Sequence, residues 1–276
     1  MKKYLLFTSL CALVLSAGMA LADWSEGDPA LFVQRPDLTS YGMDVQKTGY
    51  LWNVMLADDF SVTRDDSLRD IHIWGSWRND VYPWFNAGNV KFSFFIYDDI
   101  PAGVGGLNYS RPGMELVSVG VGENKQIVPT SYRAYATGLH EGWYNPQIPN
   151  YDPNGDTVCW QYNFNFDNIA PQGILQLEAG KIYWLQIEAL PGEQFPGEPT
   201  PIFGWKTSTQ HWHDAAAYYD FTKTPLQWRE LKYPSGHPLY QQKIDLSFVI
   251  TPEPAMLPML GVLLACLGLG RRRQRA

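Results

Sequence analysis

Residues 90–97 have the sequence VKFSFFIY, in which every second position carries an apolar side chain: Val90, Phe92, Phe94 and Ile96. Successive side chains of a β-strand point to opposite faces, so this period of two predicts a strand with one face buried in a core. Phe95 and Tyr97 lie on the other face. We therefore expect that face to be partly covered as well.

The same alternation recurs in four other stretches, residues 70–77, 159–166, 183–189 and 244–250. Clusters of Gly, Pro, Asn and Asp separate such stretches and predict turns, at residues 103–106, 111–113, 152–156, 190–192 and 196–199. Helical periodicity is nearly absent, and residues 213–219 are the one short candidate for a helix. The pattern predicts one all-β domain over residues 23–251, an antiparallel two-sheet sandwich of jelly-roll type.

The first 22 residues predict a secretory signal peptide. Lys2 and Lys3 precede an apolar stretch over residues 4–14, and Ala20-Leu21-Ala22 fits the small-x-small pattern of a cleavage site. Cleavage by signal peptidase would make Asp23 the first residue. We therefore expect the protein to be exported.

Residues 252–276 form a second signal, which has three parts. Pro252-Glu253-Pro254 cannot extend a helix, so this segment stays open to a processing enzyme. Residues 255–270 are uncharged and mostly apolar, and as a helix they would rise about 24 Å against a hydrocarbon core of about 30 Å. This predicts a short transmembrane helix. The arginines that follow would hold its end in the cytoplasm: Arg271, Arg272, Arg273 and Arg275.

In the order and spacing of these parts, the tail resembles the PEP-CTERM sorting signal of exported bacterial proteins. In that family an exosortase, a membrane-embedded cysteine protease, removes the tail near the PEP motif, usually in bacteria that make exopolysaccharide. The resemblance implies an intermediate anchored in the inner membrane, followed by delivery to the cell surface or extracellular matrix. The alternative is an ordinary single-pass anchor with a chance PEP.

The body between the two signals resembles an uncharacterised domain that recurs in PEP-CTERM proteins. The resemblance rests on five stretches, residues 57–60, 70–77, 110–113, 204–208 and 245–250. It implies a secreted β-sandwich and carries no activity across. The body has no repeat of fixed period and no linker that would divide it, which favours one domain.

The charge of the body argues against a nucleic-acid-binding protein, and its cysteine content argues against a fold held together by disulfides. Residues 23–254 contain 28 acidic and 15 basic residues, a net charge of −13, which repels phosphate backbones and excludes nucleic acid as a partner. Cys11 and Cys266 lie in the terminal signals, so Cys159 is left without a partner for an intrachain disulfide. We expect it to be a small packed residue in a core that holds the fold without cross-links.

His211-Trp212-His213-Asp214 is the sharpest candidate for a metal site. On a strand, His211 and His213 point to the same side and could share an ion with a third ligand from elsewhere. The alternative is a polar loop end. No cofactor follows firmly from the sequence.

Calcium is possible elsewhere. Residues 152–156, DPNGD, are similar to a calcium loop, but the glycine is fourth rather than sixth and the twelfth position is Asn163, so a tight turn is expected. Three pairs of neighbouring carboxylates could also bind calcium, although each pair is more often solvated: Asp58-Asp59, Asp65-Asp66 and Asp98-Asp99.

No catalytic constellation is recognisable, so we do not expect an enzyme and assign no catalytic residue. Nucleophile and phosphate-loop motifs are missing, and Glu188 and Asp245 stand alone in their predicted strands. The alternative is a secreted carbohydrate-active hydrolase, which would need two carboxyl groups about 5–10 Å apart around the scissile bond.

Aromatic residues make up 14% of the chain, including 11 Trp and 16 Tyr. Rings in loops beside polar groups are typical of sugar-binding sandwiches, which makes four tryptophans candidate ligand contacts: Trp84, Trp143, Trp212 and Trp228. The alternative is that aromatic rings fill the core. The sequence thus predicts an exported surface or matrix protein, structural or adhesive, with exopolysaccharide as a candidate ligand.

Overall fold

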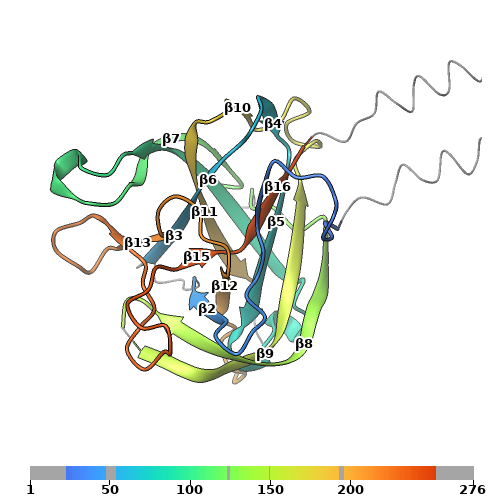
Figure 1. Cartoon of the computed structure of the whole chain (residues 1–276). Helices are drawn as coiled ribbons and strands as arrows, with labels where there is room; N and C mark the ends of the chain where they lie inside the picture. The colour runs from blue at the N-terminus through green and yellow to red at the C-terminus, as the bar shows by residue number, and fades with distance from the viewer. Residues whose placement is uncertain (1–22, 48–53, 123–124, 149, 193–195, 253–276) are drawn as a thin grey trace, which may run out of the picture.

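The computed structural model describes residues 23–47, 54–122, 125–148, 150–192 and 196–252, which form an all-β structure (Figure 1). In chain order the strands are β1 (Phe32–Gln34), β2 (Met43–Gln46), β3 (Val54–Ser61), β4 (Asp66–Leu68), β5 (Asp70–Trp77), β6 (Val90–Ile100), β7 (Arg111–Val119), β8 (Ser131–Asn145), β9 (Asn150–Asn165), β10 (Leu175–Leu177), β11 (Ile182–Pro191), β12 (Phe203–Ser208), β13 (Ala217–Asp220), β14 (Trp228–Glu230), β15 (Asp245–Leu246) and β16 (Phe248–Thr251). Three short 3-10 helices are η1 (Arg78–Asp80), η2 (Pro83–Phe85) and η3 (Val104–Gly106).

The prediction of an all-β body is confirmed. Among the described residues, no helix has the length and apolar character needed to cross a membrane. The predicted signal peptide and the tail from Glu253 onward lie outside the described residues.

The strands form two large sheets and one small sheet. The larger sheet has the order β1-β16-β5-β9-β8-β2-β12-β15, the second has the order β14-β13-β3-β11-β6-β7, and β10 pairs with β4. These pairings are antiparallel except that β2 runs parallel to β8. The prediction of a wholly antiparallel arrangement is therefore wrong at this pair, whose strands are joined by a long crossover rather than a hairpin.

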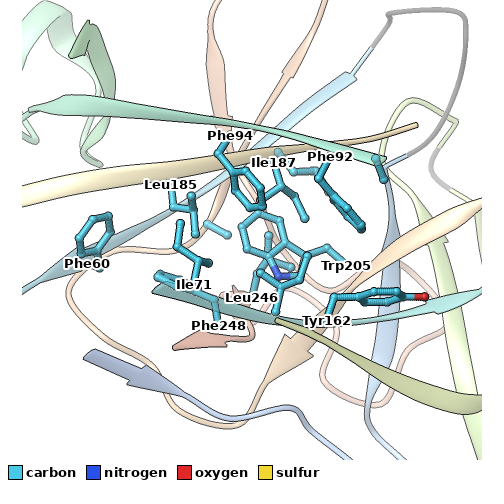
Figure 2. Close-up of a cluster of buried hydrophobic side chains, with 14 of the residues drawn as sticks. Phe60, Ile71, Phe92, Phe94, Tyr162, Leu185, Ile187, Trp205, Leu246 and Phe248 are labelled. Carbon is cyan, nitrogen blue, oxygen red and sulfur yellow. The ribbon is translucent and has the colours of Figure 1, made fainter. Parts of the chain in front are cut away.

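The hydrophobic core lies between the two large sheets (Figure 2). Phe92 and Phe94 of β6 extend from the six-stranded sheet toward Tyr162 and Phe164 of β9, and the rings of Phe94 and Phe164 are 4.7 Å apart. Trp205 of β12 lies among these side chains and is fully buried. The five predicted alternating stretches all supply this core, so the period of two is confirmed.

Some strand faces on which the sequence places polar residues among apolar ones are also buried. On β5, Trp74 lies on the face opposite the core and is covered by Trp24 and Tyr135, whose ring centroids are 5.9 and 5.5 Å from its own. Cys159 is a free cysteine packed in the same small cluster, as expected for a small packed residue. The larger sheet is thus covered on both faces around Trp74.

The larger sheet curls so strongly that five of its strands pair in a closed ring. Strand β12 pairs with both β2 and β5, so β5, β9, β8, β2 and β12 form a closed ring. The contact between β5 and β12 needs a glycine at position 75, because a Cβ there would lie 2.3 Å from the carbonyl oxygen of Gly204. Replacing Gly75 would push these strands apart. The ring surrounds the site described next.

Two local predictions are wrong. Residues 213–219 contain no helix, because residues 217–220 form β13 and pair with β3 and β14. Residues 152–156 are not a tight turn but part of β9, paired with β8. Gly155 permits this pairing, since a Cβ there would lie 2.8 Å from Cβ of Trp143.

Candidate functional site

Four charged residues from four strands of the closed ring meet inside it, and we call them the carboxylate–lysine cluster: Asp44 of β2, Glu141 of β8, Asp156 of β9 and Lys206 of β12. Lys206 is the cross-strand partner of Asp44, and Glu141 is the partner of Asp156. The parallel pairing of β2 with β8 places these two pairs side by side. All four residues are at most 4% exposed.

Lys206 forms two ion pairs in the cluster. Its Nζ lies 2.5 Å from Oε1 of Glu141 and 3.3 Å from Oδ2 of Asp44. One oxygen from each of Asp44, Glu141 and Asp156 also lies within 4.8 Å of the other two. The three carboxylates therefore converge on one small volume that a single ammonium group only partly neutralises.

Burial dominates the electrostatics of the cluster. It raises the pKa of Asp44 to about 7, and together with the charge of Asp44 it raises the pKa of Asp156 to about 10. Burial opposes the charge of Lys206, yet the carboxylates of Asp44 and Glu141 raise the lysine pKa above its ordinary value. The lysine therefore stays charged, and burial favours the protonated form of Asp156 in the ion-free cluster.

A second cluster, the histidine–aspartate cluster, contains the buried residues Asp58 and Asp59 of β3 and Asp245 of β15, together with the exposed residues His211 and His213. Nδ1 of His213 lies 2.7 Å from Oδ2 of Asp59, and the backbone N–H of Leu246 donates to Oδ2 of Asp58 at 2.6 Å. The backbone N–H of Trp212 donates to Asp245 at 2.8 Å. These bonds fasten the segment around Trp212 to the two sheets.

The two predicted histidine ligands face different carboxylates, since Nδ1 of His211 lies 3.5 Å from Asp245 and His213 contacts Asp59. Asp214 accepts from the backbone N–H of Ser110 and from Nζ of Lys243, each at 2.9 Å. Within the described part of the chain, the set with three close ligand atoms is Asp44, Glu141 and Asp156, and it includes neither histidine. A metal at His211, His213 and Asp214 stays a prediction.

The positions of Asp58, Asp59 and Asp245 in the sequence suggested solvated side chains, but all three residues are buried. They were expected to lie at strand ends or to stand alone on exposed faces. Asp59 and Asp245 lie on the second faces of β3 and β15, which are covered in the folded chain, whereas Asp58 shares the core face of β3 with Leu56 and Phe60.

Stability is expected to fall as the pH rises from about 4 to about 9. Burial raises the pKa of Asp59 to about 9, so over this range the folded chain binds a proton that the unfolded chain releases. We expect the free energy of unfolding in EDTA to fall by at least ~1 kcal/mol between pH 6 and pH 9, measured by urea denaturation. Asp59→Asn should reduce this slope without abolishing it, because burial also raises the pKa of Asp44 and Asp156. The exposed control Glu198→Gln should keep it, and equal slopes in both variants would contradict the assignment.

The four tryptophans predicted to contact a ligand occupy different environments. Trp143 is 1% exposed, and its Nε1 donates to Oε1 of Gln46 at 3.2 Å, so its ring cannot stack on a sugar in this structure. Trp212 packs on Phe32, and Trp228 packs on Tyr97 and Tyr219. Trp84 of η2 is 40% exposed, and it alone of the four presents a substantial surface.

Sequence reasoning missed the carboxylate–lysine cluster. A signal was present, because Asp44 lies between Met43 and Val45, and Lys206 lies between Trp205 and Thr207. A charge inside an apolar strand requires a partner. The pattern does not say which residue is that partner, and Asp156 fell in a segment expected to be a turn.

The fold and the site define an all-β protein whose larger sheet encloses a buried charged cluster. Residues 30–251 match the domain of unknown function DUF7901, so the chain belongs to this family. The matched region includes all four residues of the carboxylate–lysine cluster. No curated protein matches the chain, and no solved structure does.

Proposed function

We propose that this chain is an exported bacterial protein of the cell surface or extracellular matrix, sorted by its C-terminal tail and structural in role. The observation that carries the proposal is the order of segments along the chain. The family domain spans residues 30–251, after the predicted cleavage site at Asp23 and before Pro252. Signal peptidase and an exosortase are the processing partners that this order supports.

The architecture suits a domain that must persist outside the cell without disulfides. Its core is built from large aromatic side chains, and five tryptophans are fully buried: Trp74, Trp77, Trp143, Trp184 and Trp205. As part of this proposal we class the two large sheets as a jelly-roll-like sandwich. A packed core of this size supplies the stability that cross-links give to smaller exported domains.

The structure favours a structural role over the hydrolase alternative. A hydrolase needs carboxyl groups that substrate can reach, whereas the three that converge here are at most 4% exposed. Of the predicted ligand contacts, Trp84 supports binding of a surface glycan best, and it lies beside the exposed ring of Phe85. Adhesion to exopolysaccharide therefore stays a prediction, and the exposed rings of Trp84 and Phe85 in η2 are the candidate contacts.

Replacing Pro252-Glu253-Pro254 by three alanines is expected to block sorting. The full-length chain, expressed in a bacterium that makes an exosortase, should yield a shortened form at the cell surface or in the medium. The alanine variant should instead accumulate uncleaved in the membrane fraction, because the processing enzyme can no longer recognise the segment.

Immunoblots of membrane, surface and medium fractions, with mass spectrometry of the mature C-terminus, measure this outcome. Glu198→Gln is the matched control and should be processed normally. Identical mature forms from the alanine variant and the unmodified chain would overturn the sorting proposal, as would normal processing in a strain that lacks the exosortase.

A further inference from the structure

The carboxylate–lysine cluster contains buried polar atoms that nothing in the described chain satisfies. Both carboxylate oxygens of Asp156, and Oδ1 of Asp44, are buried without a hydrogen-bond partner. Asp44 is fully buried and Asp156 is 4% exposed. Buried carboxylates are almost always hydrogen-bonded, paired or bound to a metal, because an unsatisfied one destabilises the fold. These carboxylate oxygens are therefore available to a ligand enclosed by the strands.

We propose that Asp44, Glu141 and Asp156 bind one divalent hard cation, calcium, inside the closed ring of strands. The three carboxylates supply oxygen ligands only, which suits calcium rather than a metal that prefers nitrogen or sulfur. This inference goes beyond the proposed function, because neither the family nor the sorting tail assigns an ion to the chain.

The spacing of the ligand atoms fits this ion. Calcium binds oxygens at about 2.3–2.6 Å, so ligands around one ion lie at most about 5 Å apart. The three carboxylate oxygens lie within 4.8 Å of one another. They come from β2, β8 and β9, so the strand pairings hold them in place before an ion arrives.

Charge balance gives an independent argument. A bound cation would displace the proton that burial keeps on Asp156; the three carboxylates, once ionised, leave two negative charges with Lys206, and one divalent cation cancels them. Lys206 lies beside Glu141 and Asp44, whereas Asp156 makes no ion pair in the described part of the chain. The ion therefore belongs on the Asp156 side, opposite the lysine, where it shares Asp44 and Glu141 with the ammonium group.

Magnesium fits the site less well. It sheds its water molecules reluctantly and usually keeps several of them, but the cluster is enclosed by five strands and nearly inaccessible to solvent. We therefore expect calcium to bind more tightly than magnesium.

The full-length chain, purified in mild detergent and stripped with EDTA, tests the proposal. Isothermal titration with calcium chloride should show one ion per chain. The Tm should rise by roughly 5 °C at calcium a hundredfold above Kd. Magnesium chloride should give a smaller shift at the same concentration.

Asp156→Asn removes a ligand charge but keeps the shape of the side chain, and Asp156 accepts no hydrogen bond that the change would break. This variant should fold in EDTA, as judged by its cooperative unfolding, and should lose at least tenfold in calcium affinity. Glu198→Gln is the control, since it removes a carboxylate charge at an exposed position outside both clusters and should bind calcium normally.

Two results would overturn the proposal. The first is the absence of heat and of any Tm shift with millimolar calcium. The second is unchanged calcium affinity in a folded Asp156→Asn variant, which would place the ion elsewhere. Either result leaves the sorting proposal intact, because the alanine variant of residues 252–254 tests sorting without reference to calcium.

Discussion

Replacing Lys206 by methionine is expected to destabilise the protein by about 3–5 kcal/mol. Among the described residues, Lys206 is the cation that pairs with the buried carboxylates of Asp44 and Glu141, and its removal leaves these groups unpaired. Removing one member of a buried ion pair costs more than the pair contributes, because the remaining charge keeps its desolvation penalty. The variant will therefore unfold at much lower denaturant concentration, or will fail to accumulate.

Urea denaturation in EDTA measures this loss. Lys47→Met is the matched control: Lys47 is also buried and pairs with Glu188 at 2.6 Å, but the Glu188 side chain is 23% exposed and can rehydrate. The control should lose less stability than Lys206→Met. Adding Glu141→Gln to Lys206→Met should recover part of the loss. If the free energy of unfolding of Lys206→Met lies within about 1 kcal/mol of that of the unmodified chain, the stabilising role assigned to the ion pairs of Lys206 is refuted.

Trp205→Ala is expected to destabilise the protein by about 3–5 kcal/mol. The indole of Trp205 lies in the middle of the core and is fully buried (Figure 2). Its ring centroid is 6.1 Å from that of Phe248, and its Nε1 donates to the carbonyl oxygen of Ser247 at 2.8 Å. Truncation opens a large cavity between the sheets and leaves a buried carbonyl with one partner fewer.

Thermal and urea unfolding of the variant measure this effect. Trp84→Ala is the matched control, because Trp84 is 40% exposed and its removal should cost less than about 1 kcal/mol. Equal losses in the two variants would mean that burial does not explain the abundance of tryptophan. A large difference would show that most of the aromatic content stabilises the core, and would leave η2 as the remaining place for ligand contacts.

Much of the fold could be predicted because the signal is local. In residues 90–97, every second side chain must enter the core, so the period of two is visible in eight residues. Burial on the opposite face was harder to foresee. Trp74 and Asp59 lie on second faces that other segments cover, and those segments are distant in the sequence.

The wrong local predictions have a common cause. Residues 152–156 have the composition of a turn and residues 213–219 that of a short helix, but strand pairing overrides both preferences. The hydrogen bonds of a neighbouring strand contribute more than a weak local propensity. The residues of these segments matter for the site, since Asp156 joins the carboxylate–lysine cluster and His213 joins the histidine–aspartate cluster.

The sequence by itself determined the all-β class, the five alternating strands and the acidic balance of the body, because each depends on neighbouring residues or on composition. The tertiary structure alone decided the carboxylate–lysine cluster. Asp44 and Lys206 are 162 positions apart, and β12 must pair with β2, β2 with β8 and β8 with β9 before the four side chains meet. Such a meeting depends on pairings between strands that are distant in the sequence, and no local pattern in any of the four strands encodes it.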